Sequence, residues 1–187
     1  MDRLEGATLF KLEGSTITVA NEDFNLRTLF SEKMCDALGQ RKAVFFGERI
    51  SDQVPAAIKL RYQMNPRGVV SARQNPWVKD FAGTIFHREV DGLNDTSTIS
   101  GIPGLLAQDT LEQTSSDEYP GGYLHVIVTQ LMPGRPIEDY HNISASEGKQ
   151  IEGKVVQILE DVRASGWCVT SGGQDDAIYG RNTMTVY

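Results

Sequence analysis

The segment Tyr123–Met132 constrains the fold of this chain more than any other. It reads Tyr-Leu-His-Val-Ile-Val-Thr-Gln-Leu-Met and is largely apolar at odd and even positions alike. Successive side chains of a strand point to opposite faces of a sheet, so a strand that is apolar on both faces is typical of a sheet interior. We therefore expect this segment to be a central strand. It ends at Pro133-Gly134-Arg135-Pro136, a stiff link with turn chemistry.

Shorter apolar runs predict the other strands. Residues 9–19 indicate one or two strands, 43–46 and 55–62 indicate an antiparallel pair, and 105–107 begin another strand. Residues 177–179 and 183–187 flank Gly180-Arg181-Asn182, which is typical of a hairpin turn. Together with the helices below, the order of elements predicts an α+β fold without the regular alternation of a doubly wound sheet.

Three segments have helical spacing. Residues 24–38 are apolar at positions 26, 29, 30, 34 and 38, which predicts a helix there. Asn75-Pro76 has the chemistry of a helix start. Ser144 and Glu147 fit a capping box, and the helix after them is apolar at 151, 155, 158, 159 and 162.

The helix after Pro76 carries a charge on its apolar side. Trp77, Phe81, Ile85 and Leu93 fall on one column at i, i+4 spacing, and Glu89 stands in the same column. A glutamate on the apolar stripe of a helix is costly unless a cation pairs with it. We therefore expect the charge of Glu89 to be paired with a cation.

Composition limits the possible partners. The chain has 187 residues, enough for one domain, with 18 Lys+Arg against 25 Asp+Glu and a net charge of −7. The acidic balance argues against a nucleic-acid binder and against adsorption to an anionic membrane. Two cysteines are too few for a disulfide framework, the start lacks a secretory signal, and no apolar run could span a bilayer. A cytoplasmic location is expected.

Several of these features occur in an order that resembles protein kinases. Ala56-Ala57-Ile58-Lys59 is close to the V-A-I-K strand, and Glu89 follows on a helix. The strand that ends in Thr129-Gln130-Leu131-Met132-Pro133-Gly134 resembles the strand and hinge that hold adenine, and the helix of 144–166 comes where the first large-lobe helix would. The chain resembles the divergent protein-kinase-like domains common in filamentous fungi.

The resemblance implies a domain organisation. It covers residues 38–187, with a small lobe and hinge over 38–134 and part of the large lobe over 135–187. Residues 1–37 form an N-terminal extension to which it assigns no role. The fold it implies is a protein-kinase-like small lobe, an antiparallel sheet with one packed helix, followed by a hinge, a helix and a hairpin.

It also implies a nucleotide site for ATP. Lys59 would orient the phosphates and Glu89 would hold Lys59 by an ion pair. Gly39 would belong to the phosphate-covering loop, Thr129 would lie at the back of the adenine pocket, and Gln130 and Met132 would be hinge residues. Without the resemblance, Lys59 is better explained as an ordinary strand lysine that faces water. Arg41 and Lys42 could still meet phosphate, but a solvated pair of charges is the favoured interpretation, and the Asp117-Glu118 pair is expected to lie in a solvated turn.

The departures from the family pattern concern catalysis. The stretch 38–47 retains Gly39 but has no G-x-G-x-x-G run, and Ser171 falls where the catalytic Asp belongs. Asp176 falls at the position of the magnesium-binding Asn, and one carboxylate alone makes at most a weak Mg²⁺ site. The sequence stops about where a D-F-G motif would begin. No catalytic residue is therefore assigned, and kinase activity is not expected from this chain.

Three functions stay open. The first is a degenerate, non-catalytic kinase-like domain that binds a nucleotide or a protein. The second is a truncated ATP-dependent protein kinase, and the third is an acidic small-molecule-binding protein or enzyme that reuses the lobe cleft. If the domain is cut short, apolar surface on the helix at 151–162 favours self-association or a protein partner.

Overall fold

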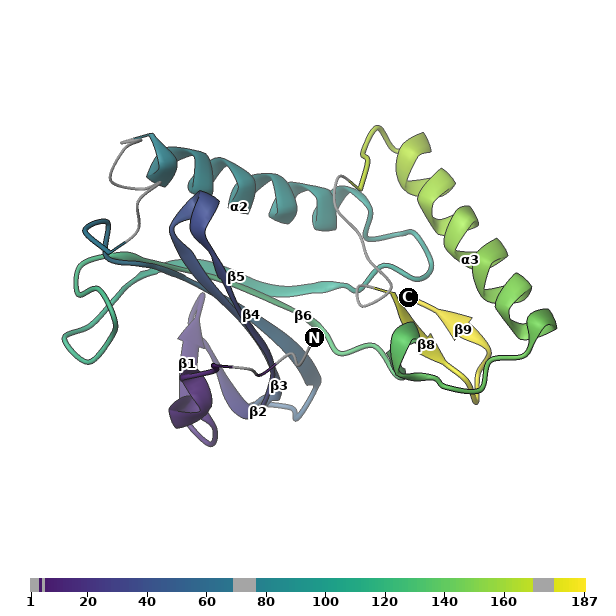
Figure 1. Cartoon of the computed structure of the whole chain (residues 1–187), viewed down its shortest axis with the longest axis horizontal. Helices are drawn as coiled ribbons and strands as arrows, with labels where there is room; N and C mark the ends of the chain where they lie inside the picture. Colours follow the sequence, from purple (N-terminus) through teal and green to yellow (C-terminus); the bar gives the residue numbers. More distant parts are fainter. Residues whose placement is uncertain (1–3, 5, 69–76, 170–176) are drawn as a thin grey trace. The chain divides into compact units, whose positions relative to one another are not determined.

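The computed structural model describes residue 4 and residues 6–68, 77–169 and 177–187 (Figure 1). The chain divides into two compact units. The first consists of Met1–Val90 and Leu105–Leu131, and the second of Asp91–Gly104 and Met132–Tyr187. In the described part of the chain, no helix is both long and apolar enough to cross a membrane.

The first unit is built on a six-stranded antiparallel sheet. Its spatial order is β1-β2-β3-β4-β6-β5. The strands are β1 (Thr16–Val19), β2 (Glu22–Cys35), β3 (Gln40–Arg49), β4 (Pro55–Gln63), β5 (Leu105–Glu112) and β6 (Tyr123–Gln130). β6 lies between β4 and β5 and is buried at every residue except Gln130, so the expectation of a doubly covered inner strand is confirmed.

One face of this sheet carries the main hydrophobic core. Even-numbered residues of β4 and β6, among them Ile58, Leu60, Val126 and Val128, are fully buried there. The 3-10 helix η1 (Leu9–Leu12) covers part of this face through the buried Leu9. Because residues 9–12 form this helix, only residues 16–19 of the predicted strand region 9–19 form a strand.

β2 replaces the helix that was predicted over residues 24–38. Its register with β3 shifts between Leu26 and Thr28 and again between Leu29 and Ser31. Each bulge adds one residue to the strand, so the buried positions Leu26, Leu29 and Glu32 come three apart instead of two. This spacing imitates a helical period, which is why the sequence pattern gave the wrong secondary structure.

The boundary expected after residue 37 falls inside this sheet. β2 pairs with β3 along Phe24–Cys35, and the short 3-10 helix η2 (Asp36–Leu38) joins the two strands. Residues 16–35 thus belong to the same compact unit as β3 and β4.

Helix α2 (Val78–Asp95) lies across the other face of the sheet (Figure 1). Its buried residues are Val78, Ala82, Phe86 and Val90. Trp77 and Phe81, expected on the inner side, are 57% and 47% exposed. The buried stripe is therefore rotated by one residue from the predicted column, because the sheet accepts the Phe86 ring rather than the rings at 77 and 81. The predicted start at Asn75-Pro76 lies outside the described residues.

The second unit packs helix α3 against a small sheet. The sheet has the order β7-β8-β9, with β7 (Arg135–Pro136), β8 (Ile178–Gly180) and β9 (Thr185–Val186). After the 3-10 helix η3 (Ile137–Asp139) comes α3 (Ala145–Ala164), whose Ser144 and Glu147 form the predicted capping box. Ile151, Tyr179 and Val186 make the core of this unit, and the predicted hairpin is confirmed as β8 and β9.

Candidate functional site

The candidate site of the first unit is the ion pair between β4 and α2. Lys59 Nζ donates to Glu89 Oε1 at 3.0 Å, and the two side chains are 41% and 27% exposed. The pairing predicted from the sequence is confirmed. Because Lys59 remains two-fifths exposed, its ammonium keeps access to solvent and to an additional anion.

A second cation shares the same carboxylate. Arg61 lies two residues after Lys59 on the same face of β4, is only 11% exposed, and pairs through Nη2 with Glu89 Oε2. Burial alone would raise the pKa of Glu89, but the charges of Lys59 and Arg61 outweigh it and hold that pKa below its usual range. Two cations on one carboxylate leave this cluster with a net charge of +1.

The sheet face around the cluster is aromatic and apolar. The His125 ring of β6 stacks on Phe86 of α2 at 4.5 Å between centroids and on Tyr123 at 4.2 Å. Burial, followed by the charges of Arg61 and His87, lowers the pKa of His125 to about 4. The imidazole is therefore neutral at pH 7 and adds no charge to the cluster.

The other residues predicted to contact a nucleotide base are in β6 or directly after it. Thr129 is 3% exposed and pairs with Ala57 across β4 and β6, so it shares the sheet face of Lys59. Gln130 is exposed at the end of β6. Among the described residues, none accepts a hydrogen bond from the Met132 N–H.

Gly39 has a structural task in the turn between β2 and β3. It has φ +55° and caps η2, its N–H donates to the Asp36 carbonyl at 3.2 Å, and its carbonyl accepts from Met64 N–H at 2.8 Å. The left-handed conformation explains a glycine at this position. Its N–H is already hydrogen-bonded within the turn. A contact between Gly39 and a phosphate stays a prediction.

Two positions that the sequence analysis compared with the kinase pattern belong to one segment near the C-terminus. Asp176 and Ser171 lie outside the described residues. Within the described ranges, no three His, Cys, Asp or Glu side chains come together in a way that could hold a metal ion.

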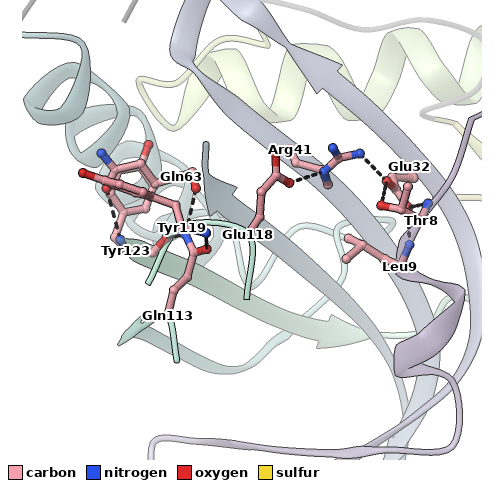
Figure 2. Close-up of polar contacts among 9 residues, drawn as sticks. All are labelled: Thr8, Leu9, Glu32, Arg41, Gln63, Gln113, Glu118, Tyr119 and Tyr123. Atoms are coloured by element: carbon pink, nitrogen blue, oxygen red, sulfur yellow. Dashed lines mark hydrogen bonds and ion pairs between the residues drawn. The ribbon is translucent and has the colours of Figure 1, made fainter. Parts of the chain in front are cut away.

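Sequence reasoning missed two charged residues that the structure makes important. Arg61 could have been found from strand periodicity, because residues two apart on a strand face the same side. Arg41, expected to be solvated, is instead 14% exposed and bridges Glu32 and Glu118, each at 2.7 Å (Figure 2). No local signal reveals this bridge, since its three members come from β2, β3 and the loop between β5 and β6.

Comparison with solved structures identifies the architecture. Vaccinia related kinase 3 matches with a TM-score of 0.51 and 12% identity over 91% of this chain and 47% of its own. The BubR1 kinase domain matches with a TM-score of 0.50 and 13% identity over 82% and 40%. WbdD, solved with the kinase inhibitor LY294002, matches with a TM-score of 0.51 and 19% identity over 80% and 29%.

The fold is kinase-like. The chain spans less than half the length of each of these three structures, and the α+β sheet with its packed helix matches their small-lobe architecture. At these identities the likeness shows the fold alone. No protein-family model matches the chain, and no curated protein does.

Proposed function

We propose that this kinase-like chain is a non-catalytic nucleotide-binding module in which Lys59 contacts the phosphates. The observation that carries the proposal is the cluster of Lys59, Arg61 and Glu89. Glu89 fixes the partly exposed ammonium, while Arg61 takes up part of the carboxylate's charge. Lys59 is thus held in place without being fully neutralised.

The charge of the cluster supports a phosphate ligand. The net charge of +1 stands in a chain whose overall charge is −7, so it is a local exception to an acidic protein. A lysine ammonium is a compact point charge that suits a phosphate oxygen. In kinases the same Lys–Glu pairing positions the nucleotide phosphates. The kinase-like fold supports the same role for Lys59 in this chain.

The hinge residues support recognition of an adenine-like base. Because Pro133 has no N–H, the donor would be Met132, whose N–H has no acceptor among the described residues. The buried Thr129 stands on the same sheet face as Lys59. A base with a hydrogen-bond acceptor could bind to this backbone.

Phosphotransfer lacks support from the sequence. The position of the catalytic base holds Ser171, whose hydroxyl has a pKa far above neutrality. Transfer requires the base, the metal ligands and the phosphate-covering loop together, whereas binding requires fewer groups. We therefore propose binding without transfer.

The test is a calorimetric titration of the whole chain with ATP, ADP and adenosine, with and without Mg²⁺. Lys59→Ala should weaken ATP binding by about tenfold to a hundredfold, the usual effect of losing one charged hydrogen bond. Adenosine binding should change little, because it has no phosphate. Lys79→Ala, at an exposed lysine of α2, is the matched control and should bind like the wild type.

Two results would overturn the proposal. One is the absence of any heat or stabilisation with all three ligands, which would favour an unrelated small-molecule ligand for the cluster. The other is equal ATP affinity in Lys59→Ala and Lys79→Ala, which would mean that Lys59 makes no phosphate contact.

A further inference from the structure

A further positive charge lies beside Lys59 on the same face of the sheet. Phe45 of β3 is fully buried in the main core, so the even-numbered residues of this strand point to the opposite face. Val44 pairs with Lys59 across β3 and β4, and Lys42 pairs with Arg61. Lys42 and Lys59 are therefore diagonal neighbours, a placement in which the Cβ atoms lie about 7–8 Å apart. Two side chains as long as lysine can reach one ligand from these positions.

Lys42 belongs to a row of cations that the sheet register creates. Lys33 of β2 pairs with Lys42, and Lys42 pairs with Arg61, so three like charges lie side by side across β2, β3 and β4. Like charges directly opposite each other destabilise a sheet. Glu89 takes up the charge of Arg61, whereas Lys42 has no hydrogen-bond or ion-pair partner within the described ranges. An anionic ligand at Lys42 would relieve this repulsion.

The charges of this face exceed what one carboxylate can balance. Lys42, Lys59 and Arg61 are three cations, and Glu89 is the one carboxylate that pairs with any of them in the described part of the chain. These four side chains together have a net charge of +2. The face therefore favours a ligand with several negative charges, such as a chain of phosphates.

A pair of aromatic rings lies on the same face, beyond Val44 along β3. The second bulge of β2 inserts Phe30 between Leu29 and Ser31, and the Phe30 ring stacks on Phe46 of β3. The ring centroids are 4.5 Å apart and the planes are 24° from parallel. Both side chains are only partly buried, so a planar base can extend this stack.

The rings and the lysines define a direction along β3. Phe46 pairs with Ala57, and Ala57 pairs with the buried Thr129, so Phe46 stands in the same row as the residue predicted to lie at the back of an adenine pocket. Lys42 is four residues from Phe46 on the same strand, about 13 Å at a rise of about 3.3 Å per residue. A base, a ribose and two phosphates cover a comparable length.

We propose that a nucleoside diphosphate or triphosphate lies along β3, with its base on Phe46, its first phosphate at Lys59 and its second phosphate at Lys42. This inference rests on the proposed nucleotide site at Lys59 and adds Lys42 and Phe46 to it. Glu89 fixes Lys59 in place, so the two ammonium groups contact different phosphates rather than a shared one. A nucleoside monophosphate reaches Lys59 alone, and inorganic tripolyphosphate reaches both lysines without a base.

The experiment compares ligands of different phosphate number by calorimetric titration of the whole chain at constant ionic strength. The ligands are adenosine, AMP, ADP, ATP and inorganic tripolyphosphate, without added Mg²⁺, so that their phosphates keep their full charge. We expect ADP to bind about tenfold more tightly than AMP, the effect of one added contact with a charged group. Tripolyphosphate should bind less tightly than ATP, because it lacks the base.

Three variants make the test specific. Lys42→Gln should reduce the preference for ADP over AMP to less than about twofold and leave AMP affinity unchanged. Lys11→Gln makes the same change of charge at an exposed lysine of η1, which covers the other face of the sheet, and should keep the full preference. Phe46→Leu should weaken the binding of adenosine, AMP and ADP about tenfold and leave tripolyphosphate affinity unchanged.

Three results would overturn this inference while leaving the proposed function intact. The first is a Lys42→Gln variant that keeps the preference for ADP, although Lys59→Ala weakens ATP binding. The second is the same loss of preference in Lys11→Gln, and the third is unchanged adenosine affinity in Phe46→Leu. If Phe46→Leu does not fold, the absence of NMR shifts of the Phe30 and Phe46 ring protons with adenosine refutes the stacking. If none of the ligands binds, both this inference and the proposed function are wrong.

Discussion

Glu32 fastens the N-terminal segment to the sheet, and its removal gives the sharpest stability prediction. Its side chain is 2% exposed and accepts from Thr8 N–H at 2.9 Å, Leu9 N–H at 2.9 Å and Thr8 Oγ1 at 3.2 Å (Figure 2). Arg41 completes the set at 2.7 Å. One carboxylate on β2 therefore satisfies two backbone donors at the start of η1.

The magnitude follows from what remains after Glu32→Ala. Arg41 keeps Glu118 as a partner, and the exposed Thr8 can return its N–H to water. Leu9 is 7% exposed, so its N–H loses a charge-assisted hydrogen bond without replacement. Such a bond contributes about 1.5–3 kcal/mol, and the buried pair with Arg41 adds to it, so we expect η1 to lose about 2–4 kcal/mol.

Native-state amide exchange measures this loss directly. Opening of η1 should become easier by about 30-fold to 1,000-fold, read at the Leu9 amide, because each 1.36 kcal/mol is a factor of ten. Amides of Val126 and Ile58, in the fully buried core, should change less. Glu112→Gln, at an exposed glutamate of β5, is the control and should stay within about 0.5 kcal/mol.

The same contacts predict a pH dependence. Burial alone would raise the pKa of Glu32, but the Leu9 and Thr8 N–H groups and the Arg41 guanidinium outweigh it and lower the pKa in the folded state. The stabilisation is thus complete above the unfolded value of about 4.3 and is lost as the pH falls through the lower folded value. Glu32→Gln should remove this acid-induced loss.

The reasoning would be refuted by exchange at Leu9 that is as slow in Glu32→Ala as in the wild type. It would equally be refuted if Glu32→Gln kept the full loss of protection in acid. Either result would mean that apolar packing of Leu9, rather than the carboxylate, holds η1 on the sheet.

Three further predictions follow from single positions. Gly47→Ala should lower the free energy of unfolding in urea by about 1–3 kcal/mol, because a Cβ there would collide with the Asn25 carbonyl oxygen. Gly83→Ala, where a Cβ would meet open space in α2, should raise that free energy by about 0.5–1 kcal/mol. Burial first, and then the charges of Arg61 and His87, lower the pKa of His125 to about 4, so His125 should titrate near pH 4 by NMR. The stability contributed by the neutral imidazole is complete above about pH 6.5 and declines as the pH falls toward 4. A titration near pH 6.5 would contradict the burial of His125. Incubation with labelled ATP and Mg²⁺ or Mn²⁺ should transfer no label to acceptor proteins, and label that depends on Lys59 would show that a base exists in the region around Asp175 and Asp176.

Sequence patterns predicted a structural feature correctly where the residues that cause it are close together in the sequence or where their chemistry requires a partner. The capping box at Ser144 and Glu147 depends on hydrogen bonds within one helical turn, so the residue types alone predict it. The inner position of β6 follows from apolar residues on both faces of one strand. The pairing of Lys59 with Glu89 was predictable because a charge on a helix stripe requires a partner, and the kinase-like order of elements suggested which one.

Other features depend on which elements meet in space. The β2 bulges arise from its register with β3, and they give a strand the spacing of a helix. The rotation of α2 is decided by the sheet, where Phe86 stacks on His125 and leaves Trp77 and Phe81 exposed.

The sequence by itself determined the α+β class and the inner strand, because both follow from periodicity, and it required a cation for Glu89, because an unpaired charge on an apolar stripe is costly. The choice of Lys59 as that cation came from the resemblance to protein kinases. Only the tertiary structure decided that Arg61 shares Glu89 and that Glu32 holds η1. These contacts join residues from separate strands and loops. The spacing of residues along the chain does not reveal which distant residues come into contact, because sheet register and burial together determine those contacts.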